Sequence, residues 1–197
     1  MMISQADFTV TERRRGTLHR HIKFLVTGFI GCLIASNPTF AHNAMEDSKT
    51  DCATTKVALP EYMKSWPNPL PSAFAQKNDD LGKNFIPIGK TVKGDLYSKG
   101  SVQFVDRPEE PGGSISYAGM LPFKIEKEGT YRVIIGEHAW IEIVQNHQFI
   151  KSSHHQRGPA CVNVGKMVDF PLKAGNYVLE LSASGKQVMK VLIVPVP

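Results

Sequence analysis

An all-β fold, either an antiparallel β-sandwich or a jelly roll with an irregular Pro-rich N-terminal arm, is predicted by this 197-residue sequence. Two observations predict it. Beyond residue 84, apolar and polar residues alternate with a period of two in successive short segments, which is typical of strands with one buried face. Turn signals rich in Gly, Pro and Asn separate these segments at spacings of about eight to twelve residues. Because no helical pattern lies between them, a parallel α/β sheet is excluded.

Residues 1–41 have the layout of a secretory signal peptide. A basic stretch around Arg13 to Arg15 precedes an apolar run from Phe24 to Ala35, which is shorter than the roughly 20 residues that a membrane-spanning helix needs. Thr39 and Ala41 are small residues at the two positions that the peptidase reads, so we expect cleavage after Ala41. The mature chain is then expected in the periplasm or secreted, with no membrane span.

The charge of the mature chain differs from that of the whole sequence. The sequence holds 23 Lys and Arg against 18 Asp and Glu, and residues 1–41 carry five of the former and two of the latter. The remainder therefore has a net charge of +2, with acidic and basic residues interleaved. A nucleic-acid partner needs a clustered basic face, so none is predicted.

Three cysteines occur in the sequence, and Cys32 lies within the predicted signal peptide. A lipoprotein box at Ile30-Gly31-Cys32 is disfavoured, because Phe29 is a poor residue for its start. Cleavage leaves Cys52 and Cys161 as the only pair, and an even count in an oxidising compartment predicts a disulfide between them.

The mature chain divides into an arm over residues 42–84 and a β-sandwich domain over residues 85–197. Within the arm we expect a short helix over Leu59 to Trp66, followed by extended chain at Pro67 to Pro71, because alternate prolines deny backbone donors. Strands are expected at Ile115 to Tyr117, Phe123 to Ile125, Tyr131 to Ile135, Trp140 to Val144, Gln148 to Lys151, Met167 to Leu172, Tyr177 to Leu181 and Val188 to Val194.

The alternation within these strands also predicts which side chains form the core. The residues expected to face inward are Tyr131, Val133, Ile135, Ile141, Ile143, Phe170, Leu172, Tyr177, Leu179, Leu181, Val191 and Ile193.

Two segments, Glu128 to Val133 and Phe170 to Leu179, share a form in which an aromatic residue restarts a strand after a Gly-containing turn. This form resembles the pre-peptidase C-terminal and carbohydrate-binding jelly-roll modules of secreted bacterial hydrolases. The resemblance implies a jelly-roll architecture.

A second resemblance is to a group of small exported bacterial proteins of unknown role, some of which carry a homogentisate 1,2-dioxygenase label. It covers about residues 105 to 185. The motifs that carry it are Pro111-Gly112-Gly113-Ser114-Ile115-Ser116-Tyr117, Ala139-Trp140-Ile141, Gly158-Pro159-Ala160-Cys161 and Lys166-Met167-Val168-Asp169-Phe170. The label implies an iron-dependent oxygenase.

Candidate binding residues gather in two segments that carry imidazole, indole and guanidinium groups. Trp140 could stack on a flat ligand, with His138 beside it, and the stretch around His154, His155 and Arg157 is expected to form a polar surface loop held by the disulfide. Imidazoles also suit zinc, copper or iron. Neighbouring strand residues point to opposite faces, however, so His154 and His155 could share a metal only in a loop.

Carboxylates at Glu137, Glu142 and Asp169 are possible acid and base groups for glycoside hydrolysis, which needs two such groups about 5 to 10 Å apart. No nucleophile elbow, phosphate-binding loop or Cys-x-x-Cys pair is present. The sequence therefore favours a non-catalytic module, without a cofactor, that binds a glycan or an envelope protein. The alternative is a metal-binding protein or oxygenase that uses His138, His154 and His155.

Overall fold

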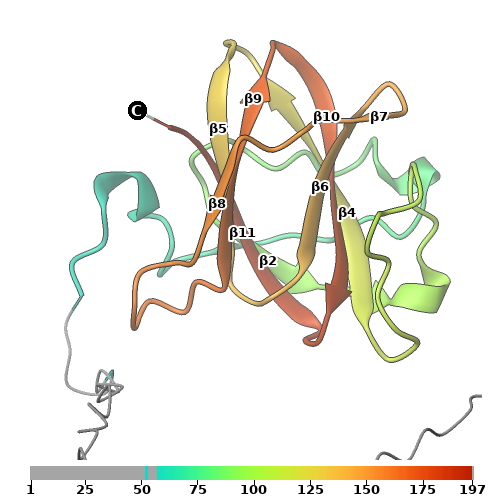
Figure 1. Ribbon diagram of the computed structural model, residues 1–197, viewed down its shortest axis with the longest axis horizontal. Helices are drawn as coiled ribbons and strands as arrows, with labels where there is room; N and C mark the ends of the chain where they lie inside the picture. The colour runs from blue at the N-terminus through green and yellow to red at the C-terminus, as the bar shows by residue number, and fades with distance from the viewer. Residues whose placement is uncertain (1–51, 53–56, 197) are drawn as a thin grey trace, which may run out of the picture. The chain divides into compact units, whose positions relative to one another are not determined.

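The computed structural model describes Cys52 and residues 57–196 of the chain. The predicted signal peptide and its cleavage point after Ala41 lie outside the described residues. Two sheets pack face to face, which confirms the predicted all-β sandwich (Figure 1). In the part of the chain that is described, no helix is long and apolar enough to cross a membrane.

The described chain contains eleven strands and three 3-10 helices. The strands are β1 (Leu70–Pro71), β2 (Val92–Asp95), β3 (Tyr97–Ser98), β4 (Tyr117–Ile125), β5 (Gly129–Ile135), β6 (Trp140–Gln145), β7 (Gln148–Phe149), β8 (His154–Gln156), β9 (Lys166–Leu172), β10 (Gly175–Ser184) and β11 (Val188–Pro195). The helices are η1 (Glu61–Met63), η2 (Asn78–Asp80) and η3 (Lys99–Ser101).

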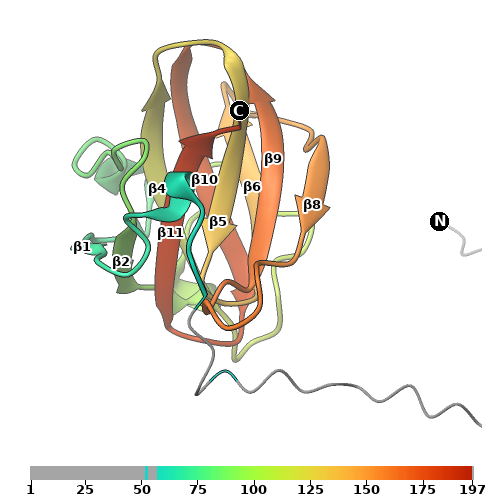
Figure 2. The same ribbon diagram turned by 90° about the vertical axis from the view of Figure 1, so that its left-hand side faces the viewer.

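One sheet, here sheet A, has the strand order β1-β2-β11-β5-β9-β8, and the other, sheet B, has the order β3-β4-β10-β6-β7. Among the named strands of the described chain, β1 and β2 pair in parallel and the other pairs are antiparallel. Figure 2 shows β1 and β2 at one side of the molecule and β8 at the other. The chain passes from sheet A to sheet B between β2 and β3, through the buried Leu96.

The core between the sheets contains all twelve of the side chains that the alternation predicts. Each is less than a tenth exposed, with Tyr131 the most accessible at 8%. Ile115, in contrast, is 92% exposed and precedes β4, so its expected place in a strand was wrong. Pro111, Gly112 and Gly113, which favour turns, lie just upstream of it and keep that segment out of the sheet.

The outer face of sheet A is also buried, because the described part of the N-terminal arm packs on it. Met63 and Trp66 contact a second apolar cluster formed by Ile134, Met167, Leu192 and Val194. The Trp66 indole Nε1 donates a hydrogen bond of 2.8 Å to the carbonyl oxygen of Val162. The expected helix in this arm is a single 3-10 turn, η1, and the expected extended segment pairs as β1.

The disulfide between Cys52 and Cys161 is present, which confirms the predicted pairing. Its Cα atoms lie 5.0 Å apart, and it links positions 109 residues apart in the chain. Trp66 binds the residue after Cys161, so a covalent bond and a hydrogen bond both attach the arm to the loop before β9.

Four strands were not predicted, namely β1, β2, β3 and β8. They are two to four residues long, too short to display alternation. His154 to Gln156 were expected in a loop, but they pair with β9 as β8. All three are exposed because β8 is an edge strand, so no buried face marks it in the sequence.

Replacing Leu179 by Ala should lower the free energy of unfolding by about 2 to 5 kcal/mol, because this fully buried side chain would leave a cavity between the sheets. Denaturant unfolding followed by circular dichroism measures the change. The control Ile115→Ala removes an exposed side chain and should alter the value by less than about 0.5 kcal/mol. Equal losses in both variants would contradict the register described above.

Replacing both Cys52 and Cys161 by Ser should lower the free energy of unfolding by up to about 4 to 5 kcal/mol, because the bridge restricts a loop of 109 residues in the unfolded chain. Denaturant unfolding of the oxidised parent and the double variant gives the difference. The parent treated with a reductant should behave as the variant does. Identical midpoints for all three samples would show that the bridge contributes nothing to stability.

Candidate functional site

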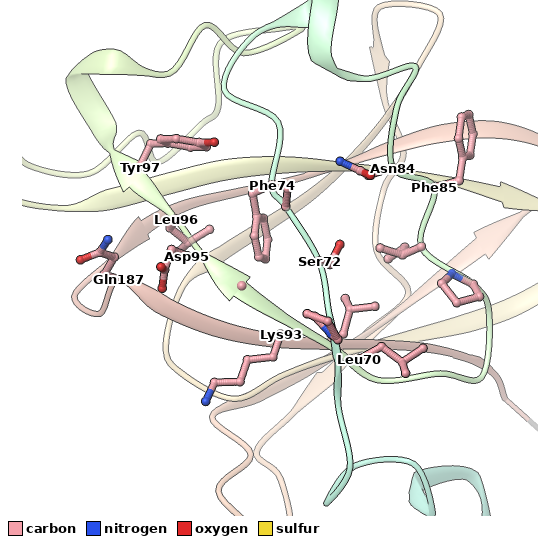
Figure 3. A pocket seen from close by; sticks show the side chains of 16 residues that line it. Leu70, Ser72, Phe74, Asn84, Phe85, Lys93, Asp95, Leu96, Tyr97 and Gln187 are labelled. Atoms are coloured by element: carbon pink, nitrogen blue, oxygen red, sulfur yellow. The ribbon is translucent and has the colours of Figure 1, made fainter.

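A groove of about 830 Å³ lies where the edges of the two sheets meet. It is bounded by β1 and the residues that follow it, by residues 84–87, by β2 and by the start of β3 (Figure 3). Residues 70–86, here the crossing segment, run from sheet A to sheet B: Leu70 pairs with Val92 of β2, and Ala75 pairs with Met120 of β4. The groove therefore lies along this segment.

Apolar side chains form both the floor and the rim of the groove. Phe74, Val92 and Leu96 are buried and make the floor. Six large apolar side chains among the described residues are substantially exposed, and three of them line this groove: Leu70 is 50% exposed, Phe85 51% and Tyr97 37%. A concentration of exposed apolar groups in one concave surface is typical of a binding site.

Polar side chains stand among these apolar groups. Figure 3 shows Asn84 between the rings of Tyr97 and Phe85, with Asp95 and Gln187 on the side of Tyr97. Lys93 and Ser72 also line the groove. Hydrogen-bond donors and acceptors are thus available beside two accessible aromatic rings.

Backbone hydrogen bonds to both sheets hold the walls of the groove in place. Leu70 N–H donates to Thr91 at 2.8 Å, and Ser72 N–H donates to Lys93 at 2.9 Å. On the side of sheet B, Ala75 and Met120 exchange two bonds of 2.8 and 3.0 Å. The groove is consequently a preformed feature of the sandwich, and a ligand would not have to order it.

Gly94 permits the close approach of the crossing segment to β2. A β-carbon at this position would overlap the carbonyl oxygen of Ser72, which belongs to the backbone and cannot rotate away. A side chain here would therefore push the crossing segment off the edge of sheet A.

The chemistry of the lining suits binding better than catalysis. Among the described residues that line the groove there is neither His nor Cys, and Asp95 is the one carboxylate. Acid-base hydrolysis of a glycoside requires a pair of carboxyl groups, and nucleophilic catalysis requires a nucleophile beside a base. The groove supplies shape, aromatic rings and hydrogen-bonding groups.

Two of the residues selected from the sequence lie together at a different place. His138 and Arg157 line a depression of about 520 Å³ beside the disulfide, which Cys52, Cys161 and Asn163 also line. Both side chains are exposed.

Trp140, the first residue of β6, is only half-buried, and one face of its ring is occupied. The Lys166 ammonium nitrogen lies 4.9 Å from the ring centroid, a cation–π contact that joins the beginnings of β6 and β9. Burial lowers the pKa of Lys166. A ligand that stacked on this face of Trp140 would have to displace the lysine.

His154 and His155 lie in β8, and their side chains are exposed. His154 is opposite Asp169 and His155 is opposite the core residue Val168, so the two imidazoles extend from opposite faces of sheet A. In the described residues, no group of three His, Cys, Asp or Glu side chains is arranged to hold a metal ion. His138, His154 and His155 thus do not form a ligand set.

The carboxylates at Glu137, Glu142 and Asp169 are also separated by the fold. Glu137 is exposed, and Glu142 lies on the outer face of sheet B. Asp169, on the outer face of sheet A, accepts bonds of 2.6 and 2.7 Å from the Arg132 guanidinium. The hydrogen bonds to Asp169 raise the pKa of the Arg132 guanidinium above its usual value. The pair also links β5 to β9.

Sequence reasoning missed the groove because its residues come from irregular segments and very short strands. The available signal was compositional: Phe85 and Tyr97 are aromatic residues in a stretch rich in Lys, Gly and Asp, where no alternation assigns them to a core.

Comparison with known families and with curated proteins finds no match to this chain.

Replacing Gly94 by Ala should lower the free energy of unfolding by about 1 to 3 kcal/mol, because the new methyl group overlaps the backbone of the crossing segment. Denaturant unfolding measures the loss. Gly82→Ala is the matched control, since a β-carbon at Gly82 meets nothing within 4 Å. A Gly94→Ala protein as stable as the Gly82→Ala protein would show that β2 and Ser72 are not in close contact.

Proposed function

We propose that this chain acts outside the cytoplasm as a non-catalytic binding module, and that its groove binds a glycan. The observation that carries the proposal is the presence of two accessible aromatic rings, Tyr97 and Phe85, on either side of Asn84 in one preformed groove. The sandwich architecture agrees with this proposal, because many β-sandwich and jelly-roll domains are binding modules.

The compartment is part of the proposal. The layout of residues 1–41 favours export, and disulfides persist in oxidising compartments. The Cys52–Cys161 bridge supports this assignment, because such a bond forms and persists in an oxidising compartment. We therefore expect the mature protein in the periplasm or in the medium.

A sugar ring fits the chemistry of the groove because it has apolar faces of C–H groups and a polar edge of hydroxyl groups. An aromatic face offers a flat apolar surface to the former. Asn84, Asp95 and Gln187 offer hydrogen-bond donors and acceptors to the latter. The charges of the groove favour neither an anionic nor a cationic ligand strongly, because Lys93 and Asp95 both line it.

Replacing Tyr97 by Ala should weaken glycan binding at least about 10-fold, because a partly exposed ring in a binding groove is a typical energetic anchor. Ligands found on an array of bacterial and plant oligosaccharides would be titrated by calorimetry against the parent and the variant. The matched control is Phe149→Ala, which removes an aromatic ring of similar exposure, 44%, from β7 outside the groove.

Binding that survives Tyr97→Ala, or that is lost equally in Phe149→Ala, would exclude the groove as the glycan site. An array on which the correctly folded, disulfide-bonded parent binds no oligosaccharide would overturn the glycan proposal. An envelope protein captured by the parent and lost in the Tyr97→Ala variant would instead assign the same groove to a protein partner.

A further inference from the structure

Residues 102–116, here the covering loop, join η3 to β4 without forming a strand. They lie against the outer face of sheet B beside β4 (Figure 1). Loops of this length inside a compact domain are uncommon and often functional. Whether the covering loop can move depends on the contacts that attach it to sheet B.

Side chains of two neighbouring strands bind the backbone of the covering loop. Glu180 of β10 accepts hydrogen bonds from the N–H groups of Val105 at 2.9 Å and Asp106 at 3.4 Å, both on Oε1. Glu142 of β6 accepts a bond of 3.3 Å from Glu109 N–H. Ser182 Oγ donates a bond of 2.7 Å to the Glu110 carbonyl oxygen.

The two glutamates are direct cross-strand partners, because Glu180 pairs with Glu142 in the register of β10 and β6. Glu180 is 1% exposed. In each carboxyl group Oε2 is buried and has no hydrogen-bond partner among the described residues. Two ionised carboxylates directly opposite each other repel, and a buried unpaired charge is costly, so this arrangement favours a proton on the pair.

The groups that face this pair do not neutralise it. On β4 the neighbour of Glu180 is the uncharged Met120, and on β6 the Trp140 indole lies near Glu142, with its buried Nε1 lacking a hydrogen-bond partner among the described residues. The covering loop adds Asp106 near Glu180 and Glu109 near Glu142. The imidazole of the exposed His147 lies 3.3 Å from Asp106 Oδ2.

Protonation is consistent with these surroundings. Burial raises the pKa of Glu180 from 4.5 to about 7, with a smaller contribution from the charges of Glu142 and Asp106, while the N–H groups of Val105 and Asp106 act in the opposite direction. Burial also raises the pKa of Glu142, against the influence of Trp140 and of the Glu109 N–H.

We propose that the covering loop is a proton-operated latch, closed over sheet B when the Glu142–Glu180 pair holds a proton and released locally when the pair is fully ionised. Release would expose the carboxyl pair to water and uncover the outer face of sheet B. This inference is independent of the glycan proposal, because none of the residues that line the groove belongs to the latch.

The direction of the pH dependence follows from linkage. The closed loop holds Glu180 with a pKa of about 7, whereas an open loop exposes it to solvent near its ordinary value of 4.5. The contribution of this carboxyl to closure is therefore full below 4.5 and is lost as the pH rises toward 7. Between pH values well below 4.5 and well above 7 the opening equilibrium should increase up to about 300-fold, since each pKa unit is a factor of 10.

Hydrogen exchange with mass spectrometry on the intact, disulfide-bonded protein tests the latch. Peptides from residues 102–116 should lose at least about 10-fold in protection between pH 5 and pH 8, after correction for intrinsic exchange rates. Peptides from β5, β9 and β11 should keep their protection at both values. Glu180→Gln carries a neutral group at both pH values, so its loop should show no such change.

Glu126→Gln is the control, because Glu126 is an exposed carboxylate away from the covering loop and should leave the parent response intact. Protection of the parent loop that is the same at pH 5 and pH 8 would overturn the proposal. A Glu180→Gln loop that responds as the parent does would also overturn it.

A second measurement avoids any dependence on how Glu180→Gln folds. In a Trp66→Phe background Trp140 is the one tryptophan, and its indole lies beside Glu142. Its fluorescence should change with a midpoint near pH 7, set by the raised pKa of Glu180. A signal that is flat from pH 5 to pH 8 would contradict the latch.

Discussion

Burial of both faces of each sheet is the constraint on which the rest of this structure depends. The inner faces make one apolar core, while the arm covers the outer face of sheet A and the covering loop lies on that of sheet B. Polar side chains on the outer faces are therefore removed from water and need partners inside the protein. Asp169 accepts hydrogen bonds from Arg132, and Ser182 donates one to a backbone carbonyl. Glu142 and Glu180, in contrast, each accept backbone hydrogen bonds on only one carboxyl oxygen.

The same constraint explains the different character of the two surfaces proposed as functional. The walls of the groove are backbone segments that bond to strand edges, so their hydrogen bonds do not titrate. The covering loop is attached mainly through side-chain carboxyl groups, and its attachment changes with the proton content of those groups. The groove is therefore a rigid feature of the sandwich, whereas the covering loop can be released by ionisation of the carboxyl groups that hold it.

The sequence predicts the sandwich and its core well because period-two alternation arises from the same burial that stabilises the sheets. It predicts the outer layers poorly. Ile134 and Leu192 occupy positions that alternation assigns to solvent, yet both are fully buried under the arm. Glu180 is likewise at an outward position and is buried by a loop whose course no local pattern indicates. The sequence does not predict Tyr97 and Phe85 as site residues, because contacts between distant segments form the groove.

The disulfide and the crossing segment together link these layers. The bridge attaches the arm to the loop before β9, and the chain then continues through β1 into the crossing segment that walls the groove. Near its middle, the Gln76 carbonyl oxygen accepts a bond of 2.8 Å from Gln103 N–H, at the start of the covering loop. Because this bond joins two backbone groups, it holds the start of the loop at any pH while the residues beyond it depend on Glu180. Release is therefore confined to the part of the loop over β10 and β6, and the groove keeps its shape.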